Sequence, residues 1–356
     1  MGHVSTFTHS MGTGPSGLIV ASCRDRESSL TGGGKMSQQI DVLMATYNGA
    51  RFVRQQIDSI LDQTHSELRL IILDDCSSDG TYEMLLAVAE RDSRICVKRV
   101  TENRGIAATF ETLLRCVTAP FFALADQDDV WRKDKLEVQL GCLIREKAAI
   151  VFSDVEVVDE KLNTLKSSMR QYAGYKPMAG AGPIAYLVKN SVTGCTVVGD
   201  SRMLLHALPF PKSVKTHDWW LAAIAARYGG LVFEQTATVK YRQHGANDTG
   251  AHRRGLYGLC RRLKAKGLTF SEYLIYRHER RWNLAVEYHR RFPGDSVGEY
   301  VGLIGENQSN GFKNSANYWR CLRKNAHQLG LRTIAIEVFM EAITRFALPL
   351  KRVARK

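Results

Sequence analysis

The stretch FFALADQDDVW, residues 121–131, runs from a short apolar segment directly into three carboxylates, Asp126, Asp128 and Asp129. Carboxylates this close repel one another, and acids at the end of a buried strand lose hydration energy. A divalent cation would offset both effects, because hard cations bind clustered carboxylate oxygens. The same letters also suit a helix start with acids in its first turn. Both interpretations hold if Asp129 caps the helix while Asp126 and Asp128 face a ligand.

Around this stretch, short apolar segments alternate with segments that carry apolar residues at helical spacing. The expected strands are 40–46, 68–73, 95–100, 121–125 and 148–153, and the expected helices are 50–63, 80–90, 106–116 and 132–146. This alternation predicts an α/β fold with a mostly parallel sheet covered on both faces. Beyond residue 154 the pattern loosens, and we expect a strand at 191–199, a helix at 217–230 and a strand at 237–247.

Polar clusters follow the predicted strands: TYN at 46–48, DDCSSDG at 74–80 and DQDD at 126–129. Ligands of parallel α/β sheets bind beyond the carboxyl ends of the strands, so these clusters indicate one binding site. Asp74 and Asp75 suit either hydrogen bonds to a ribose or base, or helix capping. The NRG triplet at 103–105 suits a nucleotide or phosphate. No GxGxxG and no GxxxxGK[ST] motif is present, which argues against a dinucleotide-binding fold and a P-loop.

Two later residues are further candidates. Asp218 precedes two tryptophans in THDWW, at the start of a predicted helix. It either caps that helix or serves as a general base with a raised pKa. His244 in YRQHGAN is an isolated histidine, and such histidines are usually structural when no other residue supports a ligand role.

The amino-acid composition limits the classes of protein to which this chain can belong. The 356 residues are 44% hydrophobic and 24% charged, as in ordinary globular proteins. No uninterrupted apolar run reaches the roughly 18 residues of a membrane-spanning helix. The eight cysteines lie far apart, which fits neither a zinc site nor a small disulfide framework and suits a reducing cytoplasm.

The net charge of +13 lies entirely after residue 250, where 21 Lys and Arg face 8 Asp and Glu. A basic tail on a neutral body suggests an anionic partner surface. Within the tail, residues 334–350 form an amphipathic segment followed by KRVARK. We expect this segment to lie on the inner face of a membrane, with packing on the catalytic domain or a dimer contact as the alternative. Residues 1–35 are rich in Gly, Ser and Thr, and we expect a disordered, dispensable leader.

Five segments taken together resemble the inverting family-2 glycosyltransferases with the GT-A fold. These segments are ATYNGARFVRQQIDSILDQT, LDDCSSDGT, ENRGIAATF, ADQDDVWRKDKLE and HDWW. The resemblance covers roughly residues 39–250, and DQDDVW together with YRQHGAN is similar to bacterial rhamnosyltransferases of surface-polysaccharide synthesis. It implies a catalytic domain at 36–250, with a nucleotide-binding half at 36–153 and an acceptor half at 154–250. Residues 251–356 then form a basic helical extension.

The resemblance also assigns roles to individual residues. The residues implied at the nucleotide are Ala45, Tyr47, Asn48, Asp75, Asn103, Arg104 and Asp126, with Asp75 recognising the base and Asp126 near the ribose. Asp126 and Asp128 match the D-x-D motif that holds Mg²⁺ or Mn²⁺, and His244 falls where some members bring a histidine to the metal or diphosphate. Asp218 takes the position of the catalytic base.

The expected activity is transfer of a sugar, with rhamnose from dTDP-rhamnose as one candidate, to a hydroxyl of a saccharide or lipid-linked saccharide. Single displacement would invert the anomeric carbon. A sugar-1-phosphate nucleotidyltransferase is one alternative, although the Gly-rich basic loop expected after its first strand is missing. A nucleic-acid-binding protein that uses the basic tail is another, but it leaves the acid clusters unexplained, so we expect no nucleic-acid partner.

Overall fold

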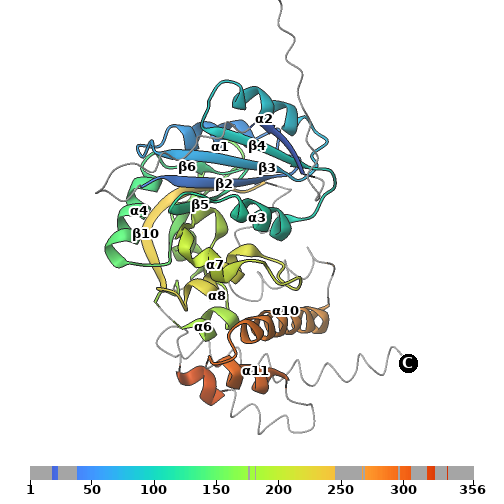
Figure 1. The fold of residues 1–356 in the computed structure, drawn as a ribbon. Helices are drawn as coiled ribbons and strands as arrows, with labels where there is room; N and C mark the ends of the chain where they lie inside the picture. The colour runs from blue at the N-terminus through green and yellow to red at the C-terminus, as the bar shows by residue number, and fades with distance from the viewer. Residues whose placement is uncertain are drawn as a thin grey trace, which may run out of the picture.

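A computed structural model describes residues 18–22, 38–174, 177–180, 182–244, 267, 269–295, 297–305, 319–324 and 335. The first part alternates strands and helices, as the apolar spacing predicts (Figure 1). Its elements are β2 (Ile40–Thr46), α1 (Val53–Leu61), β3 (Leu68–Asp74), α2 (Thr81–Ala89), β4 (Ile95–Val100), α3 (Ile106–Arg115) and β5 (Phe121–Asp126).

The second part is less regular. Its elements are β6 (Val130–Trp131), α4 (Lys135–Glu146), β7 (Ile150–Val158), β8 (Thr164–Lys166), α5 (Met169–Ala173), α6 (Pro183–Val188), η1 (Gly194–Thr196), β9 (Val198–Asp200), η2 (Ser201–Met203), α7 (Leu204–Ala207), α8 (His217–Ala225), β10 (Leu231–Arg242), α10 (Phe270–Arg291) and α11 (Val297–Gly305).

The strands, which include β1 (Leu18–Ser22), form one mixed sheet in the order β1-β4-β3-β2-β5-β9-β7-β10-β6, with β8 paired to β7. Its centre, from β4 through β3 and β2 to β5, is parallel, which confirms the α/β class. β9 then runs antiparallel to both β5 and β7. The register places Ala45 of β2 opposite Asp126 of β5, and Thr46 opposite Asp74 of β3. The loops after these three strands therefore leave the sheet at the same edge.

Alternate residues of β2 pack into two different hydrophobic clusters, because successive side chains of a strand point to opposite faces. Val42 and Met44 share one cluster with residues of α1, α2 and α4. Leu43 and Ala45 belong to the other, which includes residues of α3, α6 and α8. Figure 1 shows α1 and α2 on one side of the sheet and α3 and α8 on the other.

The C-terminal helices pack on the second of these clusters. Leu284 and Tyr288 of α10 and Tyr300 of α11 are buried in it, together with Leu322. The described part of the basic region after residue 250 therefore shares a hydrophobic core with α3, α6 and α8. Among the described residues, no helix is long and apolar enough to cross a membrane. The segment expected at a membrane surface, 334–350, lies outside the described residues except for position 335.

Part of the expected leader is a strand. β1 (Leu18–Ser22) pairs antiparallel with β4, so disorder is the wrong prediction for these five residues. The physical reason is that β4 would otherwise be an edge strand with unpaired backbone groups, which an apolar segment can cover. Cys96 of β4 is disulfide-bonded, which the reducing environment expected from the cysteine spacing does not predict. The other residues of 1–35 lie outside the described part of the chain.

Predicted boundaries after residue 190 differ from the structure. The strand expected at 237–247 is β10, which begins at Leu231 and ends at Arg242. Within 191–199 only the last two residues belong to a strand, β9 (Val198–Asp200), and the 3-10 turn η1 precedes them. The helix expected at 217–230 ends at Ala225, and Gly229 and Gly230 adopt φ values of 116° and 78° that lead into β10.

Candidate active site

The carboxylates of the DQDD sequence lie in the turn between β5 and β6. Asp129 is fully buried, and its Oδ1 accepts the Arg242 N–H at 3.1 Å. Among the described residues, its Oδ2 meets no donor within the geometric limits of a hydrogen bond. Burial raises the pKa of Asp129 well above its usual range, and repulsion from Asp128 and Asp126 raises it further, while the Cys195 thiol and Arg242 oppose the rise. The repulsion expected from the sequence is therefore present.

Arg242, at the end of β10, holds this turn in place. Its side chain donates from Nε to the Asp128 carbonyl at 2.7 Å and from Nη2 to Gln55 Oε1 of α1 at 2.7 Å. A third bond reaches the Glu160 carbonyl, and the guanidinium lies 4.6 Å from the Phe52 ring centroid. Since Arg242 is only 1% exposed, these bonds are shielded from water, and the turn is fixed to both α1 and β10.

His244 lies directly beside Asp128. Its Nε2 is 2.8 Å from Asp128 Oδ2, and its ring centroid lies 4.8 Å from that of Phe52. The structure thus brings together two residues, 116 positions apart, that the resemblance implies at the metal.

The donor atoms of this region fit a divalent cation. Ligand atoms of Asp126, Asp129 and Cys195 lie within 4.8 Å of one another, and Asp128 with His244 lies in the same turn region. Carboxylate oxygens are the ligands that Mg²⁺ and Mn²⁺ prefer. The mutual repulsion of the three acids indicates that positive charge would stabilise this turn.

Gln127 joins this turn to the loop after β2. Its Oε1 accepts the Tyr47 N–H at 2.9 Å, and its Nε2 donates to the Tyr47 carbonyl at 3.0 Å. The amide also fills the space beside Gly49, where an added Cβ would lie 2.2 Å from Gln127 Oε1. A side chain at position 49 would therefore displace Gln127.

We expect Gly49→Ala to open both hydrogen bonds between Gln127 and Tyr47. At ~1 kcal/mol per net bond, the free energy of unfolding should fall by about 1–2 kcal/mol, and nucleotide affinity should fall as well. Urea unfolding and calorimetry with UDP and dTDP measure the two effects. Gly141→Ala is the matched control, because a Cβ there meets nothing within 4 Å in helix α4. Unchanged stability and affinity in Gly49→Ala would contradict this prediction.

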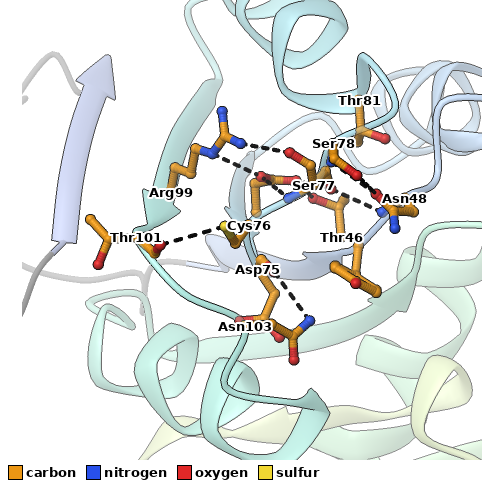
Figure 2. A network of polar contacts seen from close by, with 12 residues as sticks. Thr46, Asn48, Asp75, Cys76, Ser77, Ser78, Thr81, Arg99, Thr101 and Asn103 are labelled. Atoms are coloured by element: carbon orange, nitrogen blue, oxygen red, sulfur yellow. Dashed lines mark hydrogen bonds and ion pairs between the residues drawn. The ribbon is translucent and has the colours of Figure 1, made fainter.

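Hydrogen bonds connect the loops that follow β2, β3 and β4 (Figure 2). The Asn48 side-chain oxygen accepts the Ser78 N–H at 2.9 Å, and the Asn48 N–H donates to Ser77 Oγ at 2.9 Å. Buried Asp74 accepts from Thr46 Oγ1 at 3.0 Å and from the Ser77 N–H at 3.0 Å. Asp74 thus holds the loops after β2 and β3 together and does not cap α2, whose N-cap is Gly80.

Asp75 connects this network to the NRG triplet. Its two carboxylate oxygens accept the N–H groups of Arg104 and Gly105, each at 2.9 Å, and Asn103 Nδ2 donates to the Asp75 carbonyl at 3.3 Å. Asp75 is 4% exposed, whereas Tyr47 is 49% exposed. The structure therefore gathers the residues implied at the nucleotide at one sheet edge, with the Asp75 carboxylate already committed to two backbone amides.

Asp218 lies in the first turn of α8. Its Oδ1 accepts the Trp219 N–H at 2.7 Å, and its Oδ2 accepts from Asn190 Nδ2 at 2.9 Å. Burial raises the pKa of Asp218, and hydrogen bonds from Trp219, Asn190 and Thr216 together with the charge of Arg280 act in the opposite direction. A fixed carboxylate with a raised pKa is suited to general-base catalysis.

The turn η1 brings the base candidate and the acid cluster close together. A Cβ added to Gly194 would lie 2.9 Å from His217 Nε2 and 3.6 Å from Asp218 Cβ. The next residue, Cys195, contributes its thiol to the group with Asp126 and Asp129. Adjacent Cα atoms are about 3.8 Å apart, so η1 contacts both the start of α8 at Asp218 and two carboxylates of the DQDD turn.

Comparisons with known proteins agree with this geometry. Residues 41–196 match the profile described as glycosyl transferase family 2. The chain is 30% identical over 189 residues to the putative teichuronic acid biosynthesis glycosyltransferase TuaG of Bacillus subtilis, which covers 52% of this chain and 71% of TuaG. The chain belongs to glycosyltransferase family 2.

This family-2 glycosyltransferase has further relatives in surface-glycan enzymes. It is 29% identical over 182 residues to the Escherichia coli UDP-Glc:alpha-D-GlcNAc-diphosphoundecaprenol beta-1,3-glucosyltransferase WfgD, covering 51% of this chain and 67% of WfgD. It is 26% identical over 219 residues to the dTDP-rhamnosyl transferase RfbG of Shigella flexneri, covering 59% and 74%. The crystal structure of S. aureus TarS 1–349 with UDP-GlcNAc aligns with a TM-score of 0.52 and 14% identity over 89% of this chain and 92% of that one, which confirms the GT-A fold.

Several residues that build the site of this glycosyltransferase were not singled out from the sequence. They are Gln127, Arg242, Asn190 and Arg280. Gln127 lies in DQDDVW beside Asp126, and Arg242 lies in YRQHGAN two residues before His244. Their closeness in sequence to these candidate residues could have indicated a role in the site. Asn190 and Arg280 gave no such signal, because each meets Asp218 only through the tertiary fold.

Proposed function

We propose that this glycosyltransferase moves a sugar from a nucleotide-diphospho-sugar to a hydroxyl of a growing surface glycan, with inversion at the anomeric carbon. The observation that supports the proposal is the η1 turn, where Gly194 packs against the start of α8 at Asp218 and the next residue, Cys195, lies near Asp126 and Asp129. Asp218 can then remove a proton from the acceptor hydroxyl, while the carboxylates of the DQDD turn and their cation bind the departing diphosphate. A nucleotidyltransferase has no comparable need for a base in this position.

Asp218 acts as the general base in this proposal. Burial raises its pKa, which makes the carboxylate a stronger base, and the Trp219 N–H and Asn190 hold both oxygens in place. It accepts the proton of the acceptor hydroxyl as that oxygen attacks the anomeric carbon. Attack opposite the leaving group in a single step inverts the configuration, as in inverting glycosidases where water is the nucleophile.

Asp126, Asp128 and His244 would hold a divalent cation, Mg²⁺ or Mn²⁺. When bound, such a cation neutralises the charge that develops on the leaving diphosphate. Arg242 contributes by fixing the backbone of Asp128 and the side chain of Asp129, so that the carboxylates keep their positions. The loops that carry Ala45, Tyr47, Asn48, Asp75, Asn103 and Arg104 would bind the nucleotide.

The names of the relatives support a surface-glycan substrate. TuaG is named for teichuronic acid biosynthesis, WfgD for transfer to a diphosphoundecaprenol-linked sugar, and RfbG for dTDP-rhamnose. We therefore propose a saccharide carried on a lipid as the acceptor, which agrees with the net charge of +13. dTDP-rhamnose and UDP-glucose are the first donors to test.

A thermal-shift screen tests the proposed function. We expect at least one of UDP-glucose, UDP-GlcNAc and dTDP-rhamnose to raise the melting temperature in the presence of Mn²⁺. A ligand at 100 times its Kd stabilises the folded state by about 2.7 kcal/mol. Release of nucleoside diphosphate from the same donor then measures turnover. No stabilisation by any nucleotide sugar, with no nucleotide release, would contradict the proposal.

A further inference from the structure

Helix α10 is fixed in one register on the acceptor half. Leu284 and Tyr288 on one face of α10 are buried, and Arg291 at its end donates to the carbonyls of His206, Ala207 and Pro209 at 3.0, 2.9 and 2.6 Å. Positions 280, 284, 288 and 291 recur at helical spacing, so Arg280 projects from the same face. Figure 1 shows α10 beside α6, below α8. A slip of one residue would turn this face by about 100°.

Arg280 reaches the first turn of α8. Its Nη2 donates to Thr216 Oγ1 at 3.1 Å, and its Nη1 donates to the Tyr276 hydroxyl at 3.2 Å. The guanidinium also lies over the Trp219 ring, 5.2 Å from the centroid. Thr216 lies two residues before Asp218 and Trp219 directly after it. Arg280 therefore contacts a residue on each side of the proposed base in the sequence.

The direction of the hydrogen bonds follows from the chemistry of the groups. A guanidinium has no acceptor atom, so Thr216 must accept from Arg280. Thr216 immediately precedes α8, so Arg280 holds the residue from which the turn that carries Asp218 begins. The positive charge of Arg280 in addition opposes the burial that raises the pKa of Asp218.

We propose that Arg280 is a positioning residue for Asp218, which keeps the carboxylate ionised and aimed at the acceptor hydroxyl. The proposal rests on the proposed function, because it requires Asp218 to be the base. It makes the C-terminal region part of the acceptor-side machinery. Without α10, the base would lose its nearby cation and the outer support of Thr216.

The neighbours of the Asp218 carboxylate on α8 and on the loop after α6 are uncharged, so they do not supply the positive charge that Arg280 supplies. Within α8, His217 stacks on Phe110 and is neutral, because burial lowers its pKa to about 3. The loop after α6 supplies the uncharged Asn190. From α10 comes the cation Arg280, which acts against the burial that raises the pKa of Asp218.

The test compares Arg280→Gln, Arg280→Lys and the exposed control Arg290→Gln in the full chain. Loss of the cation should raise the pKa of Asp218, because a nearby opposite charge favours the ionised carboxylate. The acid limb of the kcat/KM profile should therefore move to higher pH in Arg280→Gln, and Arg280→Lys should restore most of the wild-type position. Among the described residues, Arg290 pairs only with Glu287 on the surface, with its side chain 70% exposed, so Arg290→Gln should leave the limb in place.

Two measurements make the outcome decisive. The first is release of nucleoside diphosphate from UDP-glucose, UDP-GlcNAc or dTDP-rhamnose with Mn²⁺, followed between pH 5 and 9. The second needs no substrate: ¹³C-carboxyl NMR of aspartate-labelled protein titrates Asp218, assigned by its absence in Asp218→Asn. An equal loss of rate at every pH, with the Asp218 titration unmoved in both Arg280 variants, would overturn the proposal. If Asp218→Asn itself keeps near-normal rates, the proposed function fails instead.

Discussion

Replacement of Asp218 by asparagine should reduce sugar transfer by about 10²–10⁴-fold, the usual cost of losing a general base, and leave donor binding nearly unchanged. The amide has almost the same shape as the carboxylate and can still accept the Trp219 N–H. It cannot accept a proton from the acceptor hydroxyl. The loss should therefore appear in kcat and not in the donor KM.

The pH profile gives this prediction a second readout. Because burial raises the pKa of Asp218 above its ordinary value of 3.8, wild-type activity should fall as the pH drops through that raised value. This acid limb should disappear from the residual rate of Asp218→Asn. Asp58→Asn is the control, since Asp58 forms only an exposed pair with Arg54 on α1, with its side chain 55% exposed. Near wild-type transfer by Asp218→Asn would mean that another group is the base.

The sheet and its helices were largely predictable because their apolar residues repeat with the right period. Val53, Ile57 and Ile60 mark the buried face of α1, and every residue of β2 is buried, as in a strand covered on both faces. The carboxyl ends of parallel strands lie at the same edge of the sheet, so the polar residues that follow β2, β3 and β5 had to lie close together. The location of the site therefore followed from the sequence.

The contacts that fix the site could not be predicted in the same way. Gln127 bonds Tyr47 across 80 positions, Arg242 bonds Asp128 across 114, and Arg280 bonds Thr216 across 64. No local periodicity relates residues at such separations. β1 escaped prediction for another reason, because a five-residue apolar segment is too short to show a period. β1 becomes a strand because it pairs with the backbone groups of β4, which would otherwise be unpaired at the edge of the sheet.

The second large effect concerns the cation. Asp128→Asn should lower transfer at saturating donor by about 10²-fold or more, since a bound metal supplies several kcal/mol of charge stabilisation and ~1.4 kcal/mol corresponds to tenfold. The fold should survive, because Arg242 binds the main-chain carbonyl of Asp128, which the substitution leaves in place. His244 would keep a neighbour able to accept a hydrogen bond but would lose the negative charge 2.8 Å from its Nε2.

Metal titration separates loss of the cation from loss of the fold. The Mn²⁺ concentration for half-maximal activity should rise steeply in Asp128→Asn, and Mn²⁺ binding followed by electron paramagnetic resonance should weaken in parallel. Asp134→Asn, which removes an acid that pairs with Arg132 at the surface, should change neither quantity. The wild-type enzyme should lose activity in excess EDTA and regain it when Mn²⁺ or Mg²⁺ is added back. Full activity in EDTA would show that the acids of the DQDD turn serve another purpose, and the repulsion around buried Asp129 would then need a different source of positive charge.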